Sequence, residues 1–345
     1  MSRADDIVQL LGPVAVLVLV GVVGGFLGRE RQLEFRDALV AAVIVVALYV
    51  FVGNSGVLSF GQVSFVAVGA FAAGLMTIPV DQKPVIVPGL FSFLAHHSVD
   101  NASSLALAAG LGGVYALVVG VPLMRLSGLA AGIATLAVLG ITHNILRNWE
   151  KISPGAQTLS TVPETTGLLQ ATAGAVAAVV LAFLYQRSRF GRQLRAARED
   201  PAAAQAAGID VHRQRLWAFV LSGALSGFAG GLFVHHLGTL STEDVYLELT
   251  FLSLAMLVVG GLTSLWGAVL GALVVSGLDS FLLDAENGEF GFDLPGGTRL
   301  VAVGAFMALV LVFMPRGLTR GREFSLPLRR LRRRRRPELP SGAAA

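Results

Sequence analysis

Residues 187–216 read RSRFGRQLRAAREDPAAAQAAGIDVHRQRL, the one long polar interruption in a chain that is otherwise almost continuously apolar. Seven arginines lie in this stretch. Each would cost about 2.5–3.5 kcal/mol at the centre of a bilayer, so the stretch is expected to lie in water between two membrane spans.

Cap signals divide the stretch into two short helices. Gly191 is expected to break the chain, and residues 192–198 then have room for two helical turns. Asp200 offers an N-cap oxygen, Pro201 suits the first helical position and Gly208 suits the position after the last turn. Because nucleation is costly, so short a helix needs a surface to dock against, and we interpret it as a plug for a cleft on another protein. The alternative is a solvated loop whose arginines only set the topology.

The composition bounds the class of protein. Of 345 residues, 54% are hydrophobic and only 14% are charged, and the apolar runs of about 20 residues are long enough to cross a hydrocarbon core of about 30 Å. We predict an all-α, polytopic membrane protein with about nine or ten transmembrane helices, some of them discontinuous. The 41 glycines suit close contact between helices in lipid. In residues 217–237 small residues recur at i, i+4 and i+8, which predicts a span with a glycine-lined face.

Several chemistries are disfavoured by the residue types present. The chain has no cysteine, which excludes disulfides and thiolate ligands. Its only lysines, Lys83 and Lys151, do not follow a glycine, so the phosphate loop of a P-loop ATPase is absent. His96 and His97 are adjacent and have no third ligand nearby, so neither a metal site nor a cofactor is expected. The spans hold no evident catalytic motif, and we expect no enzyme activity.

Two uncharged, glycine-bearing breaks interrupt the apolar runs. Residues 53–62 read GNSGVLSFGQ, and residues 260–267 read GGLTSLWG. Unwound backbone at membrane depth is tolerated only where it faces protein or a wet cavity, and discontinuous helices of this kind often form solute sites. The breaks therefore suggest two halves of related organisation. The alternative for the first break is a tight turn at the membrane surface.

The basic blocks predict the topology. Residues 187–216 and the arginine-rich residues 316–345 are both expected in the cytoplasm, with the acidic loops 238–248 and 284–298 outside. We expect a transmembrane domain over residues 1–315 and a basic cytoplasmic tail after it. The arginines of this tail fix the orientation or contact anionic lipid headgroups, and nucleic-acid binding is the remote alternative. Residues 29–37 are expected to form a charged bridge between the first two spans, and its three arginines, Arg29, Arg31 and Arg36, then lie outside unless an early segment fails to span.

Five stretches match patterns of a known family. Residues 188–219 match S-x-F-G-R-x-L-x-A-x-R-x-x-x-x-A-A-x-x-x-G-I, and residues 56–74 resemble N-L-x-x-G-Q-x-x-F-x-x-x-G-A-Y, with Phe71 where tyrosine is common. The other three stretches are residues 125–139 (with Ala130 in place of an aromatic residue), 148–159 and 260–271. These patterns resemble the LivM-like permeases of branched-chain amino-acid ABC importers.

The resemblance implies a non-catalytic subunit in the plasma (inner) membrane that works with separate partners. These are cytoplasmic ABC ATPase subunits, a second related permease subunit in a heterodimer, and an extracytoplasmic solute-binding protein. Residues 187–216 would be the coupling loop that docks on the ATPase. Its candidate residues are Gly191, Arg195, Arg198, Asp200, Pro201, Ala204, Gln205 and Gly208.

Within this family the substrate is a branched-chain amino acid, or urea and short amides in relatives. Uncharged polar groups can pass a zwitterion without trapping it, although helix-packing hydrogen bonds are an alternative role for them. The candidates for the substrate path are Asn54, Ser59, Gly61, Gln62 and Thr135. A different class, an ion-coupled secondary transporter, would need ionisable groups inside the membrane. The few candidates for it lie near predicted span ends: His143, His235, His236 and Asp279.

Overall fold

The computed structural model describes residues 3–288, 295–314 and 317–319, and helices dominate them. Within these ranges, seven helices are long and apolar enough to cross a membrane, and three apolar helices are shorter, in agreement with the predicted fold class. The long helices are α1 (Arg3–Gly25), α2 (Arg29–Ser55), α6 (Asn101–Leu123), α7 (Gly128–Asn148), α8 (Leu168–Arg187), α11 (Val211–Leu237) and α13 (Leu265–Glu286). The shorter apolar helices are α3 (Gln62–Thr77), α12 (Leu247–Gly260) and α14 (Thr298–Phe313).

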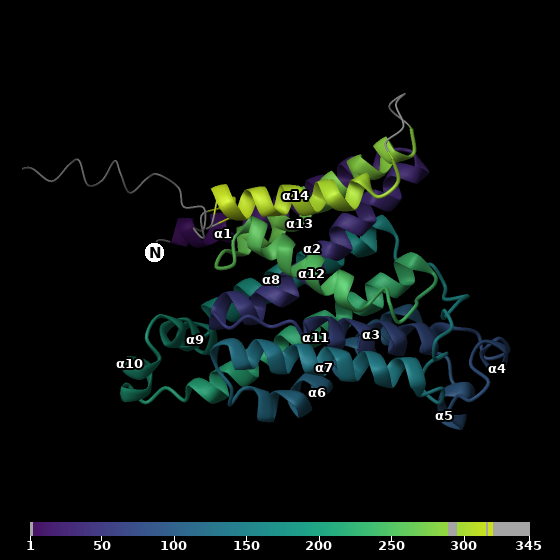
Figure 1. Cartoon of the computed structure of the whole chain (residues 1–345), viewed down its shortest axis with the longest axis horizontal. Helices are drawn as coiled ribbons and strands as arrows, with labels where there is room; N and C mark the ends of the chain where they lie inside the picture. The colour runs from purple at the N-terminus through teal and green to yellow at the C-terminus, as the bar shows by residue number, and fades with distance from the viewer. Residues whose placement is uncertain (1–2, 289–294, 315–316, 320–345) are drawn as a thin grey trace, which may run out of the picture.

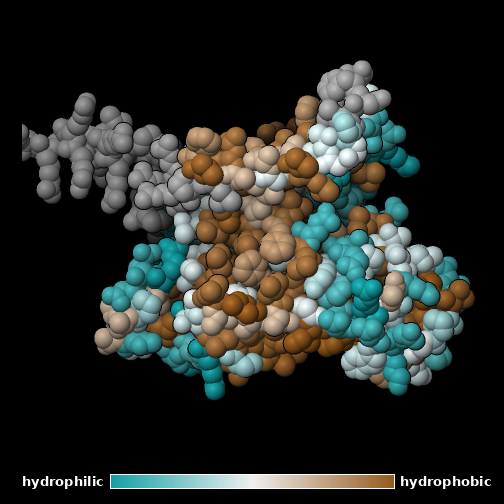
Figure 2. Space-filling view, viewed as in Figure 1, coloured by the Kyte–Doolittle hydropathy of each residue, from teal (hydrophilic) through white to brown (hydrophobic). Residues whose placement is uncertain are grey.

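Four further short helices lie at the two ends of the molecule. At one end are α9 (Arg189–Glu199) and α10 (Pro201–Ala206), and at the other are α4 (Lys83–Ile86) and α5 (Ser92–Ala95) (Figure 1). The face shown in Figure 2 is apolar in its middle and polar towards these ends, the pattern of a membrane-spanning protein.

At the α4–α5 end, the buried Lys83 ammonium donates to the carbonyls of Leu94 and His97, and burial lowers the pKa of this lysine.

Small residues on α11 allow it to pack closely against α3 and α6. A Cβ on Gly69 would lie 2.2 Å from the carbonyl oxygen of Gly227, and one on Gly230 would lie 2.1 Å from that of Val66. A Cβ on Gly112 would similarly lie 2.4 Å from the Gly223 oxygen. These distances leave no room for any larger residue, so the glycine-lined face expected of this helix is confirmed.

The charged residues 29–37 are helical, not a bridge between two spans as the sequence suggested. They form the first turns of α2, because Arg, Glu, Gln and Leu are good helix formers and Gly28 precedes them in an extended conformation. Asp37 in this segment contacts His236 near the end of α11, with 2.7 Å between Oδ1 and Nε2. Gln9 in α1 instead accepts a hydrogen bond from Arg187 beside α9. Therefore α1 runs from the α9 end to the opposite end, where α2 begins.

Both predicted breaks are present, and the helical turn that precedes the first break packs on the second. Residues 56–61 separate α2 from α3, and residues 261–264 separate α12 from α13. Gly53, in the last turn of α2, packs on the second break: a Cβ on it would lie 2.7 Å from the Leu262 oxygen. The last described residues, Gly317–Thr319, return to the same region, where Leu318 and Thr319 donate backbone hydrogen bonds to the carbonyls of Val259 and Gly260.

Candidate functional site

The first break, residues 56–61, and its neighbours carry a buried chain of polar side chains. Ser59 Oγ donates to Gln62 Oε1, and Gln62 Nε2 donates to Ser222 Oγ at 3.3 Å. Ser222 in turn donates to the carbonyl of Ala47 at 2.7 Å. The structure therefore brings Ser59 and Gln62 together, but as part of a network that joins the break to α2, α3 and α11. Ser222 was missed as a site residue, although it stands in the small-residue stripe of α11.

Thr135 in α7 docks against the same break. Its hydroxyl donates to the Gly132 carbonyl at 2.8 Å and accepts a hydrogen bond from the backbone N–H of Phe60 at 3.1 Å. A Cβ on Gly61 would lie 2.8 Å from the Thr135 carbonyl oxygen, so only glycine allows this approach. Gly61 and Thr135 are thus in direct contact.

Asn54 is separate from this network. It is fully buried in the last turn of α2, where its Nδ2 donates to the Val50 carbonyl at 3.0 Å. Among the described residues, its Oδ1 finds no hydrogen-bond partner, and the same holds for the buried hydroxyls of Ser64 and Ser226. Unpaired buried polar atoms are uncommon in folded proteins, so these three mark positions that can accept a further polar contact.

The outward side of the break is apolar. Leu58 is 45% exposed, and the ring of Phe60 makes an edge-to-face contact with Phe251 of α12 at 6.2 Å between centroids. Hence the predicted polar residues point into the packed interior of this chain, while apolar side chains face outward beside α7 and α12.

The second candidate region is the peg, which we define as residues 188–210. Its caps agree with the prediction: Asp200 Oδ1 accepts hydrogen bonds from the backbone N–H groups of Ala202 and Ala203, each at 3.0 Å. Pro201 occupies the first turn of α10, and Gly208 follows that helix with a φ of +79°, which favours glycine.

The predicted break at Gly191 is wrong. Ser188 caps α9 through its hydroxyl, which accepts a hydrogen bond from the Gly191 N–H at 3.2 Å, so Gly191 lies inside the first turn of that helix. Glycine is needed there for a close approach instead, because a Cβ would lie 2.2 Å from the carbonyl oxygen of Tyr185 in α8.

The peg has a small core of its own. Ala197, Ala204 and Val211 are buried together, with Ile209 packed against them. Ala204 therefore faces inward, whereas Gln205 faces solvent. The exposed residues of the peg and the following turn include Arg189, Phe190, Arg192, Ala202, Ala203, Gln205, Ala206, Ala207 and Arg213.

Two arginines fix the peg to the helical body. Arg195 Nη2 donates to the Gln186 carbonyl in α8 at 2.5 Å, and the Gln186 side chain accepts a hydrogen bond from Tyr49 of α2 at 2.8 Å. Arg198 Nη1 donates to the Gly53 carbonyl at 2.6 Å. Arg195 and Arg198 therefore serve as internal ties, a role that the sequence could not indicate because their partners are distant or lie on the backbone.

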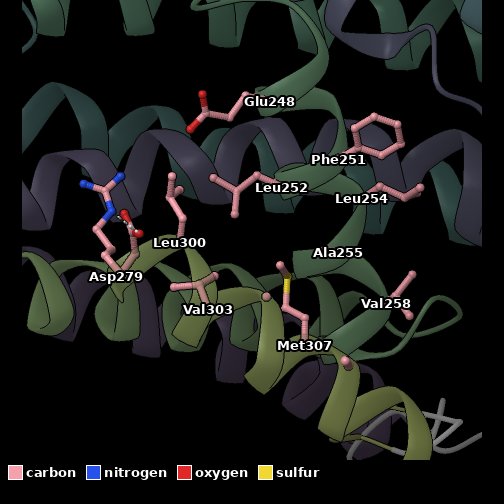
Figure 3. Close-up of a pocket in the computed structure, with 13 residues that line it drawn as sticks. Glu248, Phe251, Leu252, Leu254, Ala255, Val258, Asp279, Leu300, Val303 and Met307 are labelled. Atoms are coloured by element: carbon pink, nitrogen blue, oxygen red, sulfur yellow. Dashed lines mark ion pairs between the residues drawn. The ribbon is translucent and has the colours of Figure 1, made fainter. Parts of the chain in front are cut away.

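A groove of about 540 Å³ lies between α12, α13 and α14 and shares Phe251 with the outward side of the first break (Figure 3). Its walls are mostly apolar, with Glu248 and the Asp279–Arg299 ion pair (2.8 Å) among its lining residues. The predicted path residues do not line it.

The ionisable residues considered for ion coupling are paired near helix ends. His236 contacts Asp37, Asp279 contacts Arg299, His143 lies 3.5 Å from Glu243, and His235 contacts Ser104 and the Pro163 carbonyl. Each of these groups has a local partner, and they do not form a relay between the two ends.

Comparison with known proteins adds the family relationship. Residues 35–314 match the family described as the permease component of the branched-chain amino acid transport system. The chain is 26% identical over 346 residues to the high-affinity branched-chain amino acid transport system permease protein LivM of Escherichia coli (strain K12), covering 90% of this chain and 75% of that protein.

Shorter similarities extend to two other permeases. A probable branched-chain amino acid transport permease protein, LivH of Methanocaldococcus jannaschii, is 33% identical over 141 residues, which are 40% of this chain and 43% of that protein. The autoinducer 2 import system permease protein LsrC of Klebsiella pneumoniae is 30% identical over 166 residues, 44% of this chain and 47% of that protein. No solved structure matches.

Proposed function

Since this chain belongs to the family of branched-chain amino acid transport permeases, we propose that it is the membrane subunit of an ATP-driven importer of branched-chain amino acids, coupled through its peg to a separate cytoplasmic ATPase. The chain is a multi-pass membrane transport permease, and its relatives are permeases rather than enzymes. Import then requires a motor on another polypeptide, because the sequence has no phosphate loop.

The observation that carries this proposal is the build of the peg, residues 188–210. It is capped at Ser188 and Asp200, has its own core around Ala204, and is tied to the helical body by Arg195 and Arg198. A short helix with these supports can transmit a push as a rigid body. Its outer surface of small alanines allows close approach to a cleft.

The exposed residues of the peg suggest the chemistry of the partner. Phe190 is 48% exposed and stands between the exposed Arg189 and Arg192. We propose that this surface fits a cleft of the ATPase with an apolar floor and an acidic rim. Of the predicted coupling residues, Asp200, Pro201, Gln205 and Gly208 are exposed for such a contact.

We propose the following arrangement of the other partners. The peg end faces the cytoplasm, and α14 runs back towards that end, which supports a cytoplasmic tail after the membrane domain (Figure 1). Of the tail expected over residues 316–345, residues 317–319 bond to the end of α12, and residues 316 and 320–345 lie outside the described residues. The opposite end, with loop 238–248, meets the extracytoplasmic solute-binding protein. A second related permease completes a heterodimer in the inner membrane.

The proposed substrate path passes the first break, beside Ser59, Gln62 and Thr135, and includes Asn54 and Gly61. The contact of Gly61 with Thr135 and the unpaired Asn54 Oδ1 support it. The substrate itself is a branched-chain amino acid, as the name of LivM indicates for that relative. The relation to LsrC, which is named for autoinducer 2 import, keeps other small polar solutes such as urea or short amides as the alternative.

A photocrosslinker placed at Gln205 tests the docking role in the intact assembly. We expect adducts with the ATPase, because this side chain is exposed on α10. The matched control is the same probe at Ala204, which is buried in the core of the peg and should react within its own chain. Adducts of Gln205 with lipid or solvent alone would refute the proposal.

A further inference from the structure

We propose that Arg198 is a positioning residue that carries movement of the peg to both backbone breaks through the last turn of α2. The proposal rests on the proposed function, in which the peg is where the ATPase pushes. It concerns a different question, namely which contact takes that push into the membrane domain.

Arg198 contacts the C-terminal end of α2 with both its guanidinium group and its aliphatic stem. The guanidinium Nη1 donates to the Gly53 carbonyl at 2.6 Å. The aliphatic stem lies against Gly56, where a Cβ would be 2.6 Å from Arg198 Cγ. Glu199 holds the other edge of the guanidinium, with 2.8 Å from Nη2 to Oε1. The Arg198 side chain is only 23% exposed, so most of it is enclosed by these contacts.

The Gly53 carbonyl is available because it lies in the last turn of a helix. The last four carbonyls of an α-helix lack an intrahelical partner, and in α2 the N–H of Gly56 returns to the Val52 carbonyl. A cation near a helix C-terminus is also favoured by the helix dipole. Arg198 therefore supplies a donor and a charge where α2 requires both.

The end of α2 that Arg198 contacts, residues 53–56, adjoins both breaks. Gly56 has a φ of +71° and begins the first break, which leads to Ser59 and the buried network of Gln62. Gly53 lies directly against the second break, since even a methyl group there would come within 2.7 Å of the Leu262 oxygen. Contacts this tight are not compressible, so a displacement of the turn must displace both breaks.

The other arginines of α9 do not share the hydrogen-bond partner of Arg198. Arg195 is bonded to Gln186, only nine residues before it, and so anchors α9 to the preceding helix. Arg192 is exposed on the outer side of α9. Arg198 instead donates to the Gly53 carbonyl at the distant end of α2, 145 residues away in sequence.

The test uses the full assembly of this chain with its ATPase, second permease and binding protein in proteoliposomes. In R198A we expect normal copurification of the ATPase and near-normal ATP hydrolysis, while solute uptake per ATP falls about tenfold, the effect of losing one charged hydrogen bond. R198K should recover part of the uptake, because an ammonium can still donate to Gly53. The control R125A, at an exposed arginine in the turn between α6 and α7, should leave the uptake per ATP unchanged.

A second measurement does not depend on transport. Hydrogen exchange of the purified chain should show faster exchange over residues 53–61 in R198A than in the wild type or R125A. The proposal is overturned if R198A leaves the exchange over residues 53–61 unchanged, or leaves the uptake per ATP unchanged. Loss of ATPase binding in R198A also overturns it, because Arg198 would then be a docking residue. Failure of the wild-type assembly to take up solute with ATP refutes the proposed function instead, and the exchange experiment still decides the role of Arg198.

Discussion

At the scale of single residues, the packing of α11 depends on positions where no side chain fits. Gly69 of α3 is the clearest, because a Cβ there would lie 2.2 Å from the backbone oxygen of Gly227. The backbone of a helix cannot rotate away from a clash as the end of a side chain can, so any side chain at Gly69 would push α3 and α11 apart.

Gly69→Ala should therefore destabilise the protein by about 1–3 kcal/mol through overpacking. Thermal unfolding in detergent measures the effect. The matched control is Gly110→Ala in α6, an exposed helical position with no atom within 4 Å, where alanine should be neutral or stabilising. Equal melting temperatures for the two variants would contradict the packing of α3 on α11.

Residue roles were predictable from sequence where they are local. Asp200, Pro201 and Gly208 contact residues only a few positions away in sequence, and they cap α10 as expected. The inward position of Ala204 depends on how α10 folds back on α9 and α11, and the partner of Arg198 lies 145 residues away. Such facts follow from tertiary packing, which a cap or a spacing does not reveal.

At the scale of elements, α10 is six residues long and depends on its N-cap. Asp200→Ala removes the acceptor for two backbone N–H groups, which costs about 1 kcal/mol in a typical helix. We expect several-fold weaker copurification of the ATPase with little change in the melting temperature of the helical body. The control, Asp100→Ala, removes the cap of α6 at the opposite end and should leave ATPase binding intact.

The elements themselves were largely predictable, with errors at their boundaries. Both breaks were located because uncharged, glycine-bearing stretches differ from the apolar runs around them. The helical start of α2 was missed, because charge alone does not distinguish a water-exposed helical turn from a loop. Gly191 was read as a helix breaker, whereas it is a point of contact with α8.

At the scale of the whole molecule, the paired ionisable residues argue against a relay for coupling ions. We expect the purified chain alone to hydrolyse no ATP and to take up no solute in energised vesicles that lack ATP. Filter-binding uptake with labelled leucine, under a proton or sodium gradient, measures this. Gradient-driven uptake by the chain alone would favour the ion-coupled alternative and contradict the need for a separate motor.

The contact of Gly317–Thr319 with the end of α12 has a practical consequence for anyone shortening this chain. Leu318 and Thr319 donate backbone hydrogen bonds to the carbonyls of Val259 and Gly260, and the Thr319 hydroxyl also donates to Gly260. A truncation that stops at residue 315 would strip those donors away, whereas one that stops after Thr319 keeps them. Affinity tags and fusion partners are therefore best attached after Thr319.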